Sequence, residues 1–106
     1  MQAPSIFGLT RTVALAVTGA TAEAVRNSVR HAGAQNTTVL LEVGHHGLRV
    51  RIEDSGDGFD PHDVPPNRLG IAVSIRQRVM TAGGDVAITS APGKGTRVEL
   101  RWPLRR

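Results

Sequence analysis

The stretch from Thr10 to His31 decides the fold of the chain and reads TRTVALAVTGATAEAVRNSVRH. It is rich in alanine, and its apolar residues recur at intervals of three and four, which is the period of an amphipathic helix. These residues are Val13, Ala16, Val17, Ala20, Ala24 and Val25. Gly19 interrupts the pattern without ending it, because one glycine costs a helix only about 1 kcal/mol relative to alanine. Gly33 is a suitable stop signal. We therefore predict one long helix over residues 10–31.

After this helix the hydrophobic period changes to that of strands. Residues 37–43 are a run of β-branched and apolar side chains, and residues 48–52 alternate apolar side chains with arginine. His45, His46 and Gly47 lie between the two runs. This pattern predicts a β-hairpin with an exposed turn.

The second half of the chain repeats the order of helix followed by two strands. Residues 54–68 are rich in glycine, proline and aspartate, which predicts a loop. We expect a second helix over residues 69–82, closed by Gly83 and Gly84, and then strands over residues 85–89 and 96–102. This order predicts an α/β sandwich, with helices on one face of a mixed, mostly antiparallel sheet.

The length and composition describe one small globular domain. The chain has 106 residues, of which 40% are hydrophobic and 21% charged, and it contains no cysteine. We expect a domain over residues 10–104, a flexible lead-in over residues 1–9 and a tail at residues 105–106. The chain has no signal-peptide pattern and no apolar run long enough to cross a bilayer. A cytoplasmic compartment fits these features, although a longer parent protein could be membrane-anchored.

The formal net charge is +4, and only Lys94 among the 13 Lys and Arg residues is a lysine. The favoured interpretation is a solvated basic surface, and the alternative is a preference for phosphate, nucleic acid or an acidic partner. The aromatic residues Phe7, Phe59 and Trp102 lie outside the basic clusters. Proteins that bind single-stranded nucleic acid combine basic and aromatic side chains, so this distribution argues against nucleic acid.

Three polar residues of the predicted helix, Glu23, Asn27 and His31, are spaced by four and share one face, with Arg30 beside them. One interpretation is a solvated polar stripe. The other is a site for a cation and phosphate. In that case the Asn27 amide oxygen would bind a hard cation such as Mg²⁺, and Glu23 would orient or deprotonate a nucleophile. Arg30 and His31 would face phosphate oxygens.

Two glycine-containing segments follow strands. Residues 54–59 read DSGDGF, which is either an ordinary acidic turn or a site where Asp54 accepts a hydrogen bond from an exocyclic amine. Residues 92–96 read PGKGT and are not a phosphate-binding P-loop. Position 88, where that motif needs a glycine, is isoleucine, glycine follows Lys94, and a strand comes next.

Taken together, the segments resemble the GHKL ATPase superfamily, and most closely the bacterial sensor histidine kinases. Residues 23–33 (EAVRNSVRHAG) resemble the family's asparagine box, and residues 54–59 its first glycine box. Residues 69–71 with 75–79 and 83–84 are similar to the second glycine box and its helix. Residues 92–96 with Trp102 and Pro103 resemble the C-terminal segment. The resemblance spans residues 12–104.

This resemblance implies a Bergerat-type sandwich that binds ATP and Mg²⁺ between the long helix and a lid. It implies that Asn27 binds Mg²⁺ and that Glu23, as the candidate base, lies near the γ-phosphate. It also implies that Asp54 binds the adenine amine with help from Thr96. The other implied roles belong to Gly56 and Gly58 in the adenine pocket, Gly70 near the phosphates, Arg30 and His31 flanking them, and residues 59–69 as the lid.

The chain departs from the family pattern at three points, one of which is the brief lid. Arg68 stands where the second glycine box usually has a glycine, which either weakens phosphate affinity or supplies a cation. The family's helical hairpin with a phosphoacceptor histidine is not found, and His45, His46 and His62 lie in a turn or the lid. We therefore expect a monomer that presents Mg-ATP to a histidine on another segment or chain, with a response regulator as a further partner.

Three alternatives stay open at this point. The first is a degenerate nucleotide-binding regulatory module that acts through a protein partner. The second is a serine kinase resembling the anti-sigma-factor kinases, which share the same boxes. The third is a basic nucleic-acid-binding domain, whose binding would be sensitive to salt and indifferent to Asp54→Asn.

Overall fold

The computed structural model describes residues 11–31, 36–45, 47–60, 62–64 and 66–103, with the backbone only of His31 and of residues 66–68. The predicted lead-in and tail, the stop at Gly33, and His46 lie outside the described residues. The elements in chain order are α1 Arg11–His31, β1 Thr37–Gly44, β2 Gly47–Asp54, α2 Pro66–Thr81, β3 Asp85–Ser90 and β4 Thr96–Trp102.

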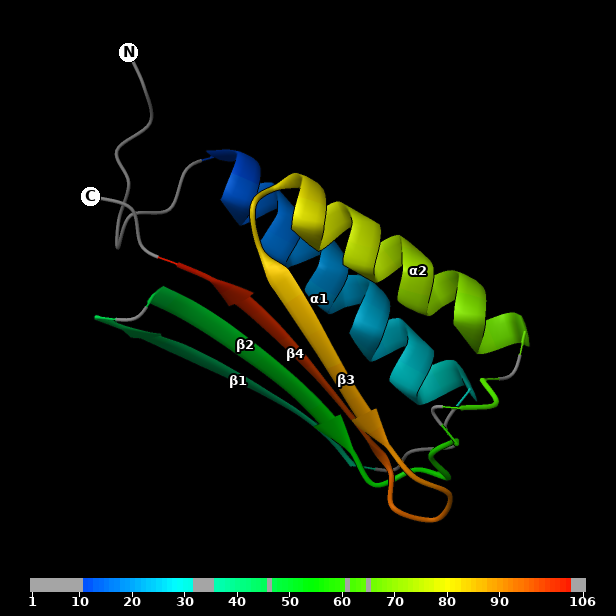
Figure 1. Ribbon diagram of the computed structural model, residues 1–106. Coiled ribbons are helices and arrows are strands. Elements are labelled where there is room, and N and C mark those ends of the chain that lie inside the picture. Colours follow the sequence, from blue (N-terminus) through cyan, green and yellow to red (C-terminus); the bar gives the residue numbers. More distant parts are fainter. Residues whose placement is uncertain (1–10, 32–35, 46, 61, 65, 104–106) are drawn as a thin grey trace.

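The described strands form one sheet in the order β1-β2-β4-β3, and each neighbouring pair is antiparallel. Figure 1 shows two layers, with α1 and α2 side by side over one face of this sheet. The predicted α/β sandwich with a mostly antiparallel sheet is therefore confirmed. Among the described residues, neither helix has the length and apolar character that a membrane span requires.

The helix α1 packs on the sheet through small side chains. Ala16, Ala20, Ala24 and Ser28 are all buried and are spaced by four. Residues at this spacing form one stripe of a helix, and alanine lets the helix backbone approach the strands closely. The alanines that recur every four residues in the sequence are therefore the residues on the face of α1 that packs against the sheet.

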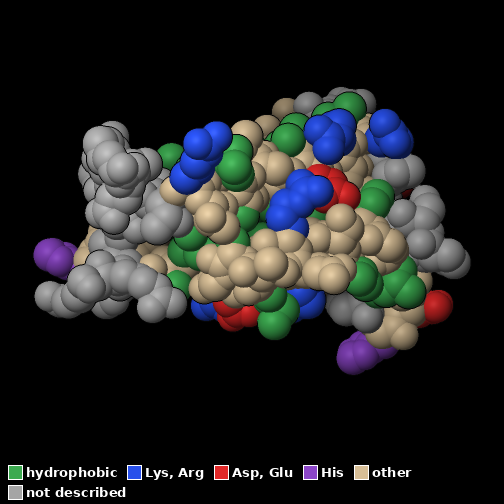
Figure 2. Space-filling model, turned by 90° about the horizontal axis from the view of Figure 1, so that it is seen from above, with side chains coloured by type: hydrophobic (Ala, Val, Ile, Leu, Met, Phe, Trp, Pro, Cys, Tyr) green, Lys and Arg blue, Asp and Glu red, His purple; other side chains and the backbone are tan. Residues whose placement is uncertain are grey.

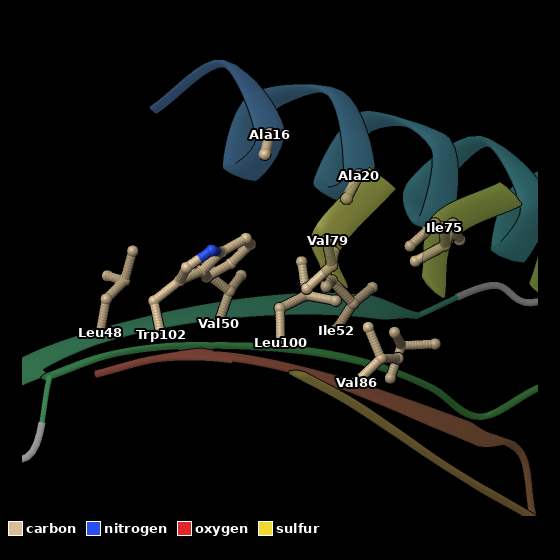
Figure 3. Close-up of a cluster of buried hydrophobic side chains, with 12 residues drawn as sticks. Ala16, Ala20, Leu48, Val50, Ile52, Ile75, Val79, Val86, Leu100 and Trp102 are labelled. Carbon is tan, nitrogen blue, oxygen red and sulfur yellow. The ribbon is translucent and has the colours of Figure 1, made fainter. Parts of the chain in front are cut away.

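The core fills the space between the helices and the strands (Figure 3). The register places Val50 of β2 opposite Leu100 of β4, and Leu100 opposite Val86 of β3. Directly opposed residues of antiparallel strands share a face, so this row points toward the helices. Ile75 and Val79 of α2 complete the core from above.

The helix α2 begins at Pro66, three residues before the predicted start at Leu69. The prediction was wrong because it treated Pro66 as a loop residue. The first-turn N–H groups of a helix have no intrahelical partner, so proline costs little there, and its fixed φ suits the helix. One consequence is that residues 66–69 of the predicted lid are helical.

The end of α2 agrees with the sequence prediction. The Gly83 N–H donates to the Met80 carbonyl at 3.0 Å and the Gly84 N–H to the Val79 carbonyl at 2.9 Å. Gly83 has a φ of 88°, in the left-handed region that favours glycine. These two bonds are a Schellman motif, which satisfies carbonyls that the helix end leaves open.

The face of the sheet away from the helices is charged. The Arg97 Nε donates to Glu53 Oε2 at 2.5 Å, across β4 and β2. Each partly exposed ion pair of this kind contributes at most about 1 kcal/mol. The other pairs on this face are Arg49–Glu42, Arg49–Glu99, Arg51–Glu99 and Arg101–Asp85. Arg49, Arg97 and Arg101 thus form part of the solvated basic surface predicted from the composition, whereas the Nε of Arg51 is buried.

Candidate functional site

One end of the helix-covered face of the sheet is polar. The register aligns Thr37, Asp54, Thr96 and Ser90 across all four strands, and we name these four residues the end row. The next row inward on this face contains Ile52 and is apolar, so the core stops one row, or two residues, before the end of β2. Polar side chains on a core-directed face need partners, which makes the end row the natural place to look for a site.

Asp54 has one oxygen committed to the fold and one oxygen open. Its Oδ1 accepts the N–H of Gly56 at 2.9 Å and the N–H of Thr96 at 3.2 Å. The other oxygen, Oδ2, has no hydrogen-bond partner among the described residues. A carboxylate in this arrangement is held in position by its own backbone and can still accept a hydrogen bond from a ligand.

The hydroxyl of Ser90 organises the end row. It accepts the N–H of Phe59 at 2.9 Å and donates its single proton to the carbonyl oxygen of Gly95 at 2.9 Å. Its third contact is with Thr96 Oγ1 at 3.0 Å. Because the Ser90 proton is already used, the Thr96 hydroxyl must be the donor in this pair. Thr96 therefore keeps acceptor lone pairs for a ligand and has no donor left.

Two glycines let the loop after β2 lie against the β3–β4 turn. Gly58 has a φ of 66° and Gly95 a φ of 76°, a backbone conformation that other residues rarely adopt. A Cβ on Gly58 would press into the Ala91 carbonyl, and one on Gly95 into the Asp54 carbonyl. The role predicted for Gly58 as a glycine that shapes the pocket therefore has a steric basis, and Gly95 has the same basis.

The helix α1 reaches this end of the sheet through Ser28. Its hydroxyl lies 2.8 Å from the Thr37 hydroxyl of the end row, and Ser28 is 3% exposed. Asn27, the neighbour of Ser28, faces a recess of about 120 Å³ whose wall on the side of α2 is Ile71. The α1 residues that line this recess are Glu23, Arg26, Asn27 and Arg30. The structure thus brings Glu23, Asn27 and Arg30 together as predicted from their spacing.

The side-chain oxygen of Asn27 is buried and has no hydrogen-bond partner among the described residues. A buried acceptor without a donor costs about 1–3 kcal/mol, so such groups in folded proteins call for an explanation. A half-turn of the amide, which exchanges its oxygen and nitrogen, would bring the oxygen to the recess, where amide oxygens are suitable ligands for a hard cation.

Glu23 is held from α2 rather than from its own helix. The Ser74 hydroxyl donates to Glu23 Oε1 over 3.4 Å, and Arg78 Nη1 lies 3.7 Å from the same oxygen. The sequence patterns did not identify Ser74, Arg78, Ser28 or Ser90 as site residues. The helical spacing of Ser74 and Arg78 by four was the available signal for the first two.

The remaining predicted residues are placed as follows. Asp54 and Thr96 line a hollow of about 460 Å³ together with Lys94. Gly70 lies in the second turn of α2, and a Cβ there would meet nothing within 4 Å. The side chains of His31 and Arg68 lie outside the described part of the structure.

A larger hollow, of about 560 Å³, lies at the opposite end of the sheet. Trp102, Gly84 and Leu48 line it, and none of the predicted site residues does. Its charged residues Arg49, Arg101 and Asp85 already have ion-pair partners. We therefore place the candidate site at the end row, with the open oxygen of Asp54, and at the recess that Asn27 lines on α1.

Solved structures similar to this chain include a histidine kinase domain and an ATP binding domain. The histidine kinase domain of the blue-light activated kinase EL346 from Erythrobacter litoralis matches with a TM-score of 0.73 and 27% identity, over 91% of this chain and 46% of that one. The ATP binding domain of PrrB from Mycobacterium tuberculosis matches with a TM-score of 0.67 and 26% identity, over 87% of this chain and 69% of that one.

Sequence relatives agree with these structures. The sensor histidine kinase LiaS of Bacillus subtilis is 34% identical over 82 residues, which are 77% of this chain and 22% of LiaS. The sensor protein VraS of Staphylococcus haemolyticus is 35% identical over 86 residues, which are 81% of this chain and 24% of VraS. The chain thus spans less than a quarter of the length of these relatives.

The fold and these similarities define an ATP-binding domain of the histidine-kinase type. The chain belongs to the family described as histidine kinase-, DNA gyrase B-, and HSP90-like ATPase, whose pattern it matches over residues 12–106. The resemblance found in the sequence motifs is therefore confirmed.

Proposed function

We propose that this chain is the catalytic domain that presents Mg-ATP for phosphoryl transfer to a histidine on another segment or chain of a two-component system. The observation that carries the proposal is the open carboxylate oxygen of Asp54, Oδ2, together with the recess lined by Glu23, Asn27 and Arg30. Phosphoryl transfer requires mainly positioning and electrostatic stabilisation from a protein, which such a site can supply.

The adenine end of the ligand would lie against Asp54 and Thr96. Asp54 Oδ2 can accept a hydrogen bond from the exocyclic amine of adenine, and its Oδ1 is fixed by two backbone N–H groups. Thr96 can add a second acceptor, because its own proton is donated to Ser90. A site with acceptors only prefers adenine, whose edge has an amine, over a base that presents a carbonyl there.

The cation would lie at Asn27. Among the described residues no group of three or more His, Cys, Asp or Glu side chains could hold a metal by itself. Mg²⁺ in nucleotide sites is held by one or two protein ligands together with phosphate oxygens and water, so the single amide of Asn27 fits this role. A half-turn about the last side-chain torsion of Asn27 exchanges its amide oxygen and nitrogen and would direct the oxygen into the recess.

The phosphates would lie between Arg30 of α1 and the start of α2. Gly70 is the fifth residue of α2, so its N–H lies beyond the first-turn N–H groups that have no partner within an α-helix. These free first-turn N–H groups, together with the helix dipole, favour an anion. Arg26, which lines the recess beside Arg30, would add a second guanidinium for phosphate. Glu23 would lie near the terminal phosphate as the base.

The test is calorimetric titration of Mg²⁺ with a non-hydrolysable ATP analogue into the wild type and Asp54→Asn. Asparagine keeps an oxygen for the two backbone N–H groups and replaces the open oxygen by an NH₂ group, so the fold is retained while the adenine contact is lost. We expect affinity to fall by about tenfold or more, the effect of leaving a polar ligand group unpaired.

Equal binding by both proteins would contradict the adenine assignment. If the wild type bound no nucleotide at millimolar concentration, the domain would instead act through a protein partner. Binding that does not strengthen on addition of Mg²⁺ would contradict the role of Asn27.

A further inference from the structure

The charge of the helical layer is one-sided. The sequences of α1 and α2 contain six arginines, at positions 11, 26, 30, 68, 76 and 78, and a single carboxylate, Glu23. Figure 2, which looks onto this layer, shows the basic side chains gathered over the helices with acidic atoms beside one of them. Glu23 is therefore the one carboxylate in a layer whose other charged side chains are cationic.

Arg78 is the cation that contacts Glu23. Its Nη1 lies 3.7 Å from Glu23 Oε1, and the two side chains are 43% and 20% exposed. Ser74, one helical turn before Arg78, donates to the same oxygen over 3.4 Å. Two groups of α2 thus converge on one oxygen of Glu23, so the carboxylate of α1 is oriented by the neighbouring helix.

Gly19 makes room for this guanidinium. A Cβ at position 19 would lie 2.6 Å from Arg78 Nη1 and 3.4 Å from its Cδ and Cζ. Glycine is otherwise unfavourable inside a helix, where alanine is preferred. The interruption that Gly19 makes in an alanine-rich helix therefore has a local cause: the Arg78 side chain lies across the helix where a methyl group would be.

From this geometry we infer that Arg78 is a positioning residue, which orients Glu23 and offsets its charge beside the nucleotide. The inference rests on the proposed function, in which Glu23 lies near the terminal phosphate. A carboxylate near a phosphate repels it, and an adjacent guanidinium offsets that repulsion. Without Arg78, the charge of Glu23 would lower the affinity for a triphosphate more than the affinity for a diphosphate, because only the triphosphate has a terminal γ-phosphate near Glu23.

The experiment compares the affinities for the Mg²⁺ complexes of a non-hydrolysable ATP analogue and of ADP, measured by calorimetry. The variants are Arg78→Met, Glu23→Gln combined with Arg78→Met, and Gly19→Ala. Arg76→Met is the matched control, because the Arg76 guanidinium lies on the same helix but donates to the Val86 carbonyl at 3.1 Å. Thermal unfolding of each variant checks that it is folded.

We expect Arg78→Met to lower the ratio of ATP-analogue to ADP affinity about fivefold, the upper end for an ion pair of this exposure. Glu23→Gln in the same chain should restore the ratio, because the uncompensated charge is removed. Gly19→Ala should lower the ratio without lowering the unfolding midpoint, since alanine favours the helix while its methyl group displaces the guanidinium.

An unchanged ratio in Arg78→Met, or an equal change in Arg76→Met, would overturn the inference. An unchanged ratio in Gly19→Ala would overturn the role of Gly19. If the wild type failed to bind either nucleotide, the proposed function and this inference would both be wrong. If it bound in an Asp54-dependent way and only the ratio failed to respond, the inference alone would be wrong.

Discussion

Asp54 Oδ1 lies 3.2 Å from the backbone nitrogen of Thr96, a residue 42 positions later in the chain. The two residues are also directly opposed in the pairing of β2 with β4. One oxygen of the carboxylate therefore accepts backbone N–H groups of the fold, while the other stays open at the site. For this reason Asp54→Ala and Asp54→Asn should differ in their effects on stability.

Asp54→Ala should destabilise the fold, whereas Asp54→Asn should not. Alanine leaves the N–H groups of Gly56 and Thr96 without their acceptor, which costs about 1–3 kcal/mol, whereas asparagine retains an oxygen for both. Urea unfolding of the three proteins measures the difference in free energy of unfolding. Equal stability of the two variants would mean that the Oδ1 contacts contribute nothing.

Ser28→Ala should destabilise the fold by about 1 kcal/mol, because it removes the hydroxyl that joins α1 to Thr37 of the end row. Thr18→Ala is the control, since the exposed Thr18 hydroxyl bonds only to the Ala14 carbonyl of its own helix. That substitution should be neutral or slightly stabilising, because alanine favours the helix. Thermal unfolding compares them, and equal shifts in the midpoint would contradict the prediction.

Gly95→Ala should be more destabilising than Gly93→Ala. Both glycines have a φ of 76°, so the backbone strain of about 1–2 kcal/mol is common to both substitutions. A Cβ on Gly93 meets nothing within 4 Å, whereas one on Gly95 presses into the Asp54 carbonyl. Gly95→Ala should therefore also weaken binding of the ATP analogue by displacing Asp54. Calorimetry and urea unfolding test both effects, and identical behaviour of the two variants would contradict the steric argument.

Leu100→Ala should lower the free energy of unfolding by about 2–5 kcal/mol, as expected for a large side chain removed from a packed core. Leu100 is 0% exposed at the centre of the sheet, whereas Leu15 of α1 is 64% exposed. Leu15→Ala should change stability by less than about 0.5 kcal/mol. Denaturant unfolding measures both, and a small effect at Leu100 would mean that the core lies elsewhere.

Much of the fold was predictable because the hydrophobic period is a local property. The alanine stripe of residues 16–24 predicted both the helix α1 and the face that it buries. The strand from Thr96 to Trp102 was predicted with its observed bounds. The start of α2 was missed, because Pro66 is compatible with a turn and with the first turn of a helix, and local sequence does not distinguish the two.

The site was predictable only in part. The spacing of Glu23, Asn27 and Arg30 placed them on one helical face, and the structure puts all three in one recess. The contacts of Glu23 were not predictable, because Ser74 is 51 positions away and lies on another helix. The direction of the hydrogen bond between Thr96 and Ser90 was not predictable either. It depends on the Ser90 hydroxyl, which donates its own proton to the Gly95 carbonyl.

The sequence by itself determined the elements, their order, the faces they bury and, through its motifs, the family. The elements and their buried faces depend on residues a few positions apart, whose relative geometry a single helix or strand sets. The family follows from the order of the motifs along the chain. Only the tertiary structure decided which oxygen of Asp54 stays open and that Arg78 contacts Glu23. It also decided that the Arg78 guanidinium lies against Gly19, where a Cβ would block it. These contacts depend on the packing of α1 against α2 and on strand register, and both are set only when the whole core is assembled.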